Sequence, residues 1–266
     1  ATEEKRGVGE PTNEPAVKGA RESFVETVRT NTSMVRRRLR APELRIAEHI
    51  VGRQSLTPVD VLWLEGIADP ETVARVRRRL DDMDIDAIEA AGNLEEYLTD
   101  SVHTPFPLLP YTQRPDRFCQ GLLEGRVGLI LDGSPMMLCV PFFFIEYFHS
   151  PDDYYQNYLV ASFARVLRFL CFYLSVSVPA LYVALVGFHQ NLIPDRLLNI
   201  ILDSKKDVPF TTGAEVLGLL IAYELLQESG VHLPQAIGQS VSTIGGIVVG
   251  TAAVEAGLIA PMVLIV

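Results

Sequence analysis

Residues Phe169–Phe188 read "FLCFYLSVSVPALYVALVGF", a run of 20 residues without a charged side chain. A helix of about 20 apolar residues is long enough to cross the roughly 30 Å hydrocarbon core of a bilayer. A buried helix of a soluble protein is rarely apolar on every face over such a length. Pro179 lies inside the run and is tolerated in membrane helices, where it can produce a kink. We therefore expect this run to be a transmembrane helix.

Charge is distributed unevenly on the two sides of this run. Residues 1–160 carry 18 Lys and Arg with 26 Asp and Glu. Residues 161–266 carry only 5 Lys and Arg with 7 Asp and Glu. Such a shift predicts a water-facing part followed by a lipid-facing part. The acidic balance of the first part argues against a general nucleic-acid-binding protein, which usually carries a basic surface.

The pattern before residue 150 predicts an α/β soluble domain at 17–150, preceded by a polar, disordered linker at 1–16. Asp69 and Pro70 form a helix-start signal, with Asp69 as the cap. Asp132 and Gly133 separate two apolar runs, which indicates a β-hairpin. The remaining expected elements are a helix with connectors over about 17–53, a buried strand at 60–67, and short helices at 92–100 and 114–125.

The pattern after residue 150 predicts a helical membrane domain at 151–266, truncated at its C-terminus. Ser150 precedes two acids and begins a helix with an aromatic face, which is typical of a helix at the membrane interface. Further candidate spans follow at 208–230, at 233–254 and, in part, at 256–266. The predicted fold is thus an α/β soluble domain followed by an α-helical multi-span membrane domain.

Several polar residues of the second part are candidates for an ion path or for pairing between helices. Glu215 and Glu224 are nine residues apart, so they point to opposite sides of one helix. A carboxylate inside a bilayer is costly and therefore marks a functional or paired position. Either glutamate could line a cation path or pair with the arginines that precede the first span. The full candidate set is Glu215, Glu224, Gln239, Glu255, Arg165 and Arg168.

The segment "QAIGQSVSTIGGIVVGTAAVEAG", residues 235–257, combines apolar residues with glycines and hydroxyls. It contains no lysine and no phosphate-loop pattern, which argues against nucleotide binding. Gly246 and Gly250 form a G-x-x-x-G motif, which lets helices approach closely in lipid. With Gly245 they predict a small-residue seam, suited to tight helix packing, a subunit interface or a wet channel lining.

No catalytic constellation emerges from the sequence. There is no G-x-S-x-G motif, no HExxH-type histidine pair and no CxxC. The acids Asp81, Asp82, Asp84 and Asp86 lack the order of a calcium-binding loop, since Ala87 follows Asp86. We therefore expect a protein that is not an enzyme, with no catalytic residues, no cofactor and no metal site.

Several long blocks of the chain resemble one family, the A subunits of GerA-type spore germination receptors. The blocks are "KGARESFVETVRTNTSMVRRRLR" (18–40), "LEGIADPETVARVRRRLDDMDID" (64–86), "TQRPDRFCQGLLEGRVGLILDGSP" (112–135), "SPDDYY" (150–155) and "LPQAIGQSVSTIGGIVVGTAAVEAGLIAPMVLIV" (233–266). The resemblance implies a fragment that lacks the first N-terminal subdomain and the last membrane helices. It supplies no catalytic residues.

The resemblance also implies a function and partners. It implies a multi-pass protein of the spore inner membrane, with the soluble domain on the cytoplasmic side. The expected partners are membrane lipid, further copies of the chain, a transporter-like B subunit and a lipoprotein C subunit. The chain would be an oligomeric subunit that contributes to ion release when a nutrient is sensed. Two alternatives stay open: a non-conducting scaffold or auxiliary subunit, and a secondary transporter protomer.

Overall fold

The structure is a computed structural model, and it divides into two compact units, Ala1–Arg165 and Val166–Val266. It describes residues 7, 9–11, 14, 19–100, 103–104, 106–231 and 235–265, with side chains except at 231 and 235–242. The division falls inside one long helix, and each unit is treated by itself below. The domain bounds expected from the sequence stay a prediction.

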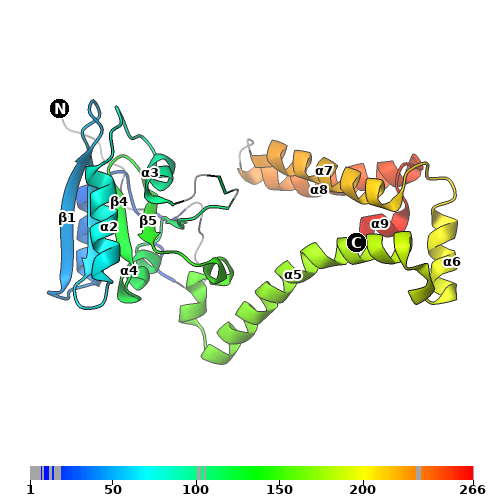
Figure 1. Ribbon diagram of the computed structural model, residues 1–266, viewed down its shortest axis with the longest axis horizontal. Helices are drawn as coiled ribbons and strands as arrows, with labels where there is room; N and C mark the ends of the chain where they lie inside the picture. The colour runs from blue at the N-terminus through cyan, green and yellow to red at the C-terminus, as the bar shows by residue number, and fades with distance from the viewer. Residues whose placement is uncertain are drawn as a thin grey trace. The chain divides into compact units, whose positions relative to one another are not determined.

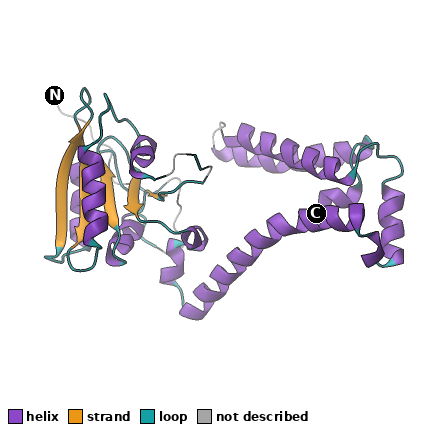
Figure 2. Ribbon diagram, viewed as in Figure 1, coloured by secondary structure: helices purple, strands orange, loops and turns teal. Residues whose placement is uncertain are grey.

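The first unit contains a five-stranded antiparallel sheet (Figures 1 and 2) with the strand order β1-β2-β4-β5-β3. All five residues of the central strand β4 are buried. The strands are β1 (Leu44–Val51), β2 (Thr57–Leu64), β3 (Tyr111–Thr112), β4 (Val127–Leu131) and β5 (Met137–Val140). The unit is therefore an α/β layer structure of the predicted kind.

Helices cover both faces of this sheet. On one face, helices α2 (Pro70–Asp81) and α3 (Ala91–Leu98) pack on a core that includes Val61 and Leu129. On the other face, α1 (Val28–Arg38) and α4 (Pro115–Leu123) pack on a second core, which contains Leu62. Alternate residues of a strand point to opposite faces of the sheet, so Val61 packs in the first core and Leu62 packs in the second.

Two local predictions in this unit are confirmed. The Asp69 carboxylate accepts hydrogen bonds from the backbone N–H groups of Glu71 and Thr72, and Pro70 begins α2. Val73, Val76 and Leu80 of α2 are buried. β4 and β5 pair in antiparallel register across the turn at Asp132-Gly133, and Gly133 has a φ of +83°.

Two other local predictions are wrong, and a third is confirmed in part. Residues 44–51 form the edge strand β1 rather than part of a helix, because "LRIAEHIV" alternates in burial and pairs in register with β2. The first helix begins at Val28, so Phe24 and Val25 reach the core from extended chain. Ser150 caps a helix with two acids in its first turn, as predicted, but this is the short 3-10 helix η2 (Pro151–Tyr155), which ends before the next helix begins.

The second unit is helical throughout its described residues. It begins within α5 (Tyr158–Phe188) and continues through η3 (Gln190–Leu192), α6 (Asp195–Ser204), α7 (Thr212–Val231), α8 (Gln235–Glu255) and α9 (Pro261–Ile265). Among the described residues, α5 is the one helix with the length and apolar composition to cross a membrane. The further spans stay a prediction.

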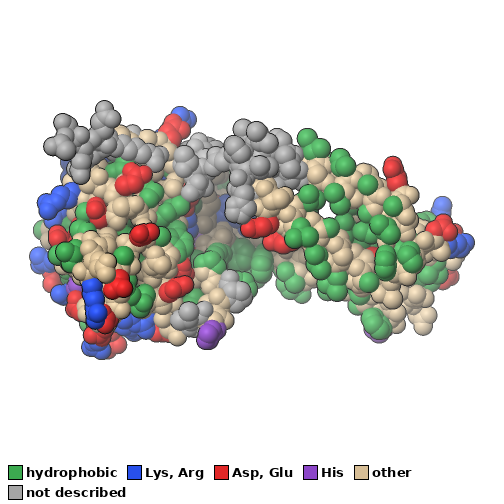
Figure 3. All heavy atoms as spheres, turned by 90° about the horizontal axis from the view of Figure 1, so that it is seen from above, with side chains coloured by type: hydrophobic (Ala, Val, Ile, Leu, Met, Phe, Trp, Pro, Cys, Tyr) green, Lys and Arg blue, Asp and Glu red, His purple; other side chains and the backbone are tan. Residues whose placement is uncertain are grey.

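Exposed apolar side chains distinguish the second unit from the first. On the face seen in Figure 3, charged side chains are dense over the first unit and sparse over the helices of the second. In the most apolar 18-residue stretch of α5, only 6% is buried. Large patches of exposed apolar surface mark contact with lipid or with another protein.

Candidate functional site

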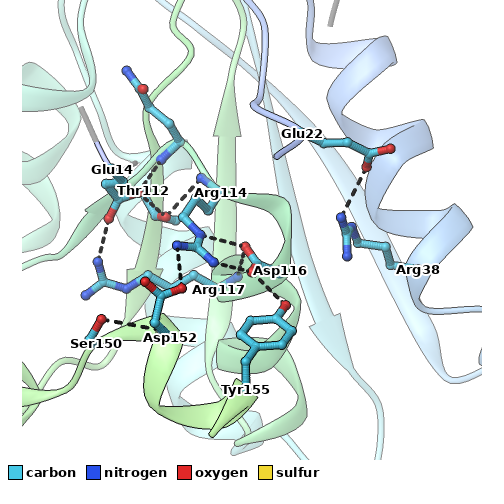
Figure 4. A network of polar contacts seen from close by, with 11 residues as sticks. Glu14, Glu22, Arg38, Thr112, Arg114, Asp116, Arg117, Ser150, Asp152 and Tyr155 are labelled. Carbon is cyan, nitrogen blue, oxygen red and sulfur yellow. Dashed lines mark hydrogen bonds and ion pairs between the residues drawn. The ribbon is translucent and has the colours of Figure 1, made fainter. Parts of the chain in front are cut away.

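A buried arginine lies at the N-terminus of α4 (Figure 4). The Arg114 side chain is 2% exposed and forms a bidentate contact with Asp116, with Nη2 2.7 Å from Oδ2 and Nε 3.1 Å from Oδ1. Its Nη1 atom lies 3.3 Å from Oδ1 of Asp152, in η2. The guanidinium therefore joins the start of α4 to the 3-10 helix that precedes α5. Bidentate arginine–carboxylate pairs add geometric specificity to the contact.

Asp116 is the acidic centre of this network. It also accepts a hydrogen bond of 2.8 Å from the Tyr155 hydroxyl. Burial pushes the pKa of the Asp116 carboxyl upward, but the hydrogen bonds from Arg114 and Tyr155 outweigh burial and hold that pKa below its ordinary value. The carboxylate is therefore ionised at neutral pH, and the buried arginine keeps its counter-ion.

A residue near the N-terminus joins the same network. One oxygen of the Glu14 carboxylate accepts hydrogen bonds from the Thr112 hydroxyl at 2.7 Å and from the Gln113 backbone N–H at 2.9 Å. The other oxygen lies 2.6 Å from Nη1 of Arg117. Segments that lie about 100 residues apart in sequence thus meet at one polar cluster, since the Glu14–Thr112 separation is 98. We call the set Glu14, Thr112, Arg114, Asp116, Arg117, Asp152 and Tyr155 the arginine network.

Gly19 lies directly against the arginine network. A Cβ atom at this position would be 2.2 Å from Nη2 of Arg114. The guanidinium cannot swing away without leaving Asp116, so the close approach requires a residue without a side chain.

A second polar group holds the start of α5 to the first unit. Arg165, in α5, lies 3.1 Å from the carboxylate of Asp153, whose side chain is 1% exposed. The Arg165 guanidinium also lies 5.1 Å from the centre of the Tyr154 ring. Asp153 closes a capping box with Ser150, which fixes η2. These contacts hold the first turns of α5 against η2 within the first unit.

The arginine network joins separate segments of the first unit. The hollow beside it, lined by Arg117, Glu146 and Tyr154 among others, has a volume of about 50 Å³. Small-molecule sites usually have volumes of about 300–1,000 Å³. The described residues contain no group of three or more His, Cys, Asp or Glu that could hold a metal ion. Cys119 and Cys139 are buried, and burial raises the pKa of both thiols to about 12.

The residues that the sequence grouped as an ion path or pairing set have different surroundings within their own units. Glu215 is 2% exposed and pairs with Lys205, whereas the sequence suggested Arg165 or Arg168 as its partner. Arg165 pairs with Asp153 in the first unit. Arg168 is half-buried in α5.

Glu224 and Glu255, two other members of the set, differ from the buried Glu215 in exposure. Glu224 is exposed on α7, and Glu255 is exposed at the end of α8. Gln239 lies in α8, but its side chain is outside the described residues. The exposure of Glu224 leaves it available to water, lipid headgroups or a neighbouring protein. Its role in an ion path stays a prediction.

The glycine seam of α8 packs against helices of the same chain. A Cβ atom on Gly245 would lie 3.3 Å from Leu226 of α7, and one on Gly246 would lie 3.9 Å from the Tyr223 ring of α7. A Cβ atom on Gly250 would lie 2.4 Å from Cδ1 of Leu264 in α9. The three glycines therefore lie against α7 and α9 of the same chain, and the role of the seam stays a prediction.

Sequence reasoning missed the arginine network and Lys205. The segment "RPD" at 114–116 showed only a helix start, and Asp152 showed only a helix cap. Nothing in the local pattern indicated that Arg114 and Asp152 meet, because 38 residues separate them. The signal that could have been followed is an arginine, Arg114, at the N-cap position directly before Pro115 and Asp116, where a Ser, Thr, Asp or Asn is usual.

Comparison with known proteins places the chain in a family. The family model for the Bacillus/Clostridium GerA spore germination protein matches residues 1–266. The chain is 38% identical to spore germination protein KA and 37% identical to spore germination protein A1, both of Bacillus subtilis strain 168. It is also 38% identical to the uncharacterized membrane protein YfkQ of the same organism. These matches cover 98–99% of the chain and 48–54% of the relatives.

One solved structure is also similar, the N-terminal domain of the A subunit of the Bacillus megaterium spore germinant receptor GerK3. It is 38% identical in sequence, and the superposition covers 46% of this chain and 97% of that chain with a TM-score of 0.38. The chain spans about half the length of the curated relatives it matches. The assignment rests on the family match and on the sequence identities, and by these the chain belongs to the GerA spore germination protein family.

Proposed function

We propose that this chain is part of an A-type subunit of a nutrient-responsive germinant receptor in the spore inner membrane. The observation that carries the proposal is the family match over the whole chain, together with relatives named as spore germination proteins. The apolar helix α5 supports a membrane location. The soluble unit would lie on the cytoplasmic side.

The proposed partners are other subunits of the receptor. GerK3 is named as a receptor with an A subunit, which supports an assembly of different chains. We infer assembly with a transporter-like B subunit and a lipoprotein C subunit, and self-association of the A subunit. Exposed apolar side chains on α5 and α7, such as Phe163 and Leu225, offer surfaces for lipid and neighbouring helices.

In this account the first unit acts on the membrane part through α5. The arginine network fixes η2, and the Asp153–Arg165 pair fixes the first turns of α5 on the soluble unit. A shift of the soluble unit would therefore move α5 and the helices that follow it, which is how rigid elements carry a change between sites. Ion release is the proposed output.

A conductance measurement tests the proposed output. The complete protein is reconstituted in liposomes alone and with its B and C subunits, and nutrient-triggered potassium flux is recorded. The account predicts flux that depends on nutrient and on the A subunit. Glu224→Gln should change this flux if the exposed α7 carboxylate lies on the path, and Asp203→Asn, in the exposed end of α6, serves as the matched control.

A second candidate function is a non-conducting scaffold or auxiliary subunit. The observation that favours it is that the membrane protein YfkQ, which carries no germination name, is 38% identical over 99% of the chain. That likeness equals the one to germination protein KA. A scaffold would show no flux in liposomes under any nutrient, while its loss from spores would still reduce the amount of assembled receptor.

A further inference from the structure

Two segments of the second unit, the end of α6 and the residue before α9, meet at the carboxylate of Glu215 in α7. Its Oε1 atom lies 2.6 Å from Nζ of Lys205, the residue that ends α6. Its Oε2 atom accepts a hydrogen bond of 2.9 Å from the backbone N–H of Ala260, which lies just before α9. The hydroxyl of Thr212, at the start of α7, accepts a hydrogen bond from the Lys205 ammonium.

Both charged groups of this cluster are withdrawn from solvent. The side chain of Glu215 is 0% exposed and that of Lys205 is 15% exposed. A buried carboxylate is tolerated only with a partner of opposite charge and hydrogen bonds on its remaining lone pairs. The Lys205 ammonium supplies the opposite charge beside Oε1, and the Ala260 N–H donates a hydrogen bond to Oε2.

Apolar contacts lead from the pair to α9. Val216, which follows Glu215, packs in one buried cluster with Ala260 and Val263 of the α9 segment. Leu264 of α9 lies against Gly250 of α8, where a Cβ atom would be 2.4 Å from its Cδ1. The segment 260–264 is therefore held by a polar contact to α7 and by apolar contacts to α7 and α8.

We propose that the Lys205–Glu215 pair is a clasp that positions α9 against α7. Glu215 bonds to α6 and to the α9 segment at once, so removal of either charge leaves the other buried without its partner. The role of Glu215 is then to hold helices together, and it does not line an ion path. This inference concerns the packing of the second unit and is independent of the proposed receptor function.

Disulfide cross-linking in the intact membrane protein tests the clasp. Val216→Cys with Val263→Cys reports the α7–α9 contact, in a background where the exposed native cysteine is replaced by Cys171→Ser. We expect Lys205→Met and Glu215→Ala each to lower the fraction cross-linked by about fivefold, because each leaves the clasp incomplete. Lys205→Arg, which keeps the positive charge, should retain most of the cross-linking. The exchange Lys205→Glu with Glu215→Lys should not restore it, because a lysine at position 215 cannot accept the hydrogen bond from the Ala260 N–H.

Two controls separate the clasp from a general folding defect. Tyr223→Cys with Gly246→Cys reports the α7–α8 contact, which the clasp does not touch and which should cross-link equally in every variant. Tyr182→Phe removes a buried hydroxyl that has no hydrogen-bond partner among the described residues, so it should leave the α7–α9 signal unchanged. The proposal is overturned if the α7–α9 signal survives loss of either charge, or if the α7–α8 signal falls equally.

Discussion

At the scale of single residues, Arg114 links the start of α4 to η2. It joins Asp116 and Asp152, both of which are largely buried, and Gly19 lies against its guanidinium. Breaking a buried ion pair by removing one partner typically costs about 3–5 kcal/mol, because the remaining charges stay buried without compensation. The residue therefore determines both the stability of the first unit and the position of η2.

We predict that Arg114→Met lowers the free energy of unfolding of the first unit by about 3 kcal/mol. Arg114→Lys should recover only part of this loss, since a lysine cannot form the bidentate contact with Asp116. Thermal unfolding monitored by the circular dichroism of the soluble unit measures the effect. Arg75→Met, at an exposed position of α2, is the matched control and should change stability by less than about 0.5 kcal/mol. Equal stability of the Arg114 and Arg75 variants would contradict this account of the network.

A second residue-scale prediction concerns Asp60, in β2, which is 8% exposed and accepts a hydrogen bond of 2.7 Å from Thr32. Burial raises the pKa of Asp60 above its ordinary value of 3.8, and the nearby Glu48 raises it further, against the opposing hydrogen bond from Thr32. The folded state therefore disfavours the charged form of Asp60. The free energy of unfolding declines as pH rises from 3.8 through the raised pKa of Asp60.

Asp60→Asn removes that charge and should raise the free energy of unfolding at pH 7. The gain should shrink as pH falls toward 3.8, because Asp60 becomes protonated in the folded and unfolded states alike. Chemical denaturation at a series of pH values gives the measurement, with Glu48→Gln as the exposed neighbour for comparison. A variant that is less stable than the parent at pH 7 would show that the hydrogen bond from Thr32 outweighs the effect of burial.

At the scale of elements, local signals predicted the helices better than they predicted the strand at the edge. Asp69, Pro70 and the spacing of Val73, Val76 and Leu80 lie within one segment, so they determine α2 without reference to the rest of the chain. β1 was missed because its alternation becomes decisive only when it pairs with β2. The arginine network escaped for the same reason, since Glu14, Arg114 and Asp152 meet only in the folded unit.

The glycines of α8 yield a prediction at this scale. Gly250→Ala should displace Leu264 and weaken the packing of α9 on α8 by about 1–2 kcal/mol, because overfilling a tight contact is destabilising. Gly246→Ala should be tolerated, since its Cβ atom would lie 3.9 Å from the Tyr223 ring, an ordinary contact.

Protease accessibility of α9 in the membrane-embedded protein distinguishes the two glycine variants. Leu264→Ala placed on Gly250→Ala should restore protection, because the shorter side chain removes the clash. Equal protection of α9 in both single variants would show that Gly250 and Leu264 are not in contact in the membrane.

At the scale of the whole molecule, the chain combines a soluble α/β unit with a helical unit that begins inside α5. Family membership follows from a match over residues 1–266, while the chain spans about half the length of its relatives. The central proposal is that this chain is part of a subunit of a germinant receptor. In this role the first unit, the contacts at the start of α5 and the apolar helices of the second unit would act together.

The most direct measurement of that claim is nutrient-triggered cation release from spores that lack the complete protein. Spores with the gene removed are compared with spores complemented by the intact gene over a panel of amino acids, sugars and nucleosides. The account predicts that removal abolishes release for at least one nutrient and that the intact gene restores it. Unchanged release for every nutrient that the parent spores answer would contradict the account.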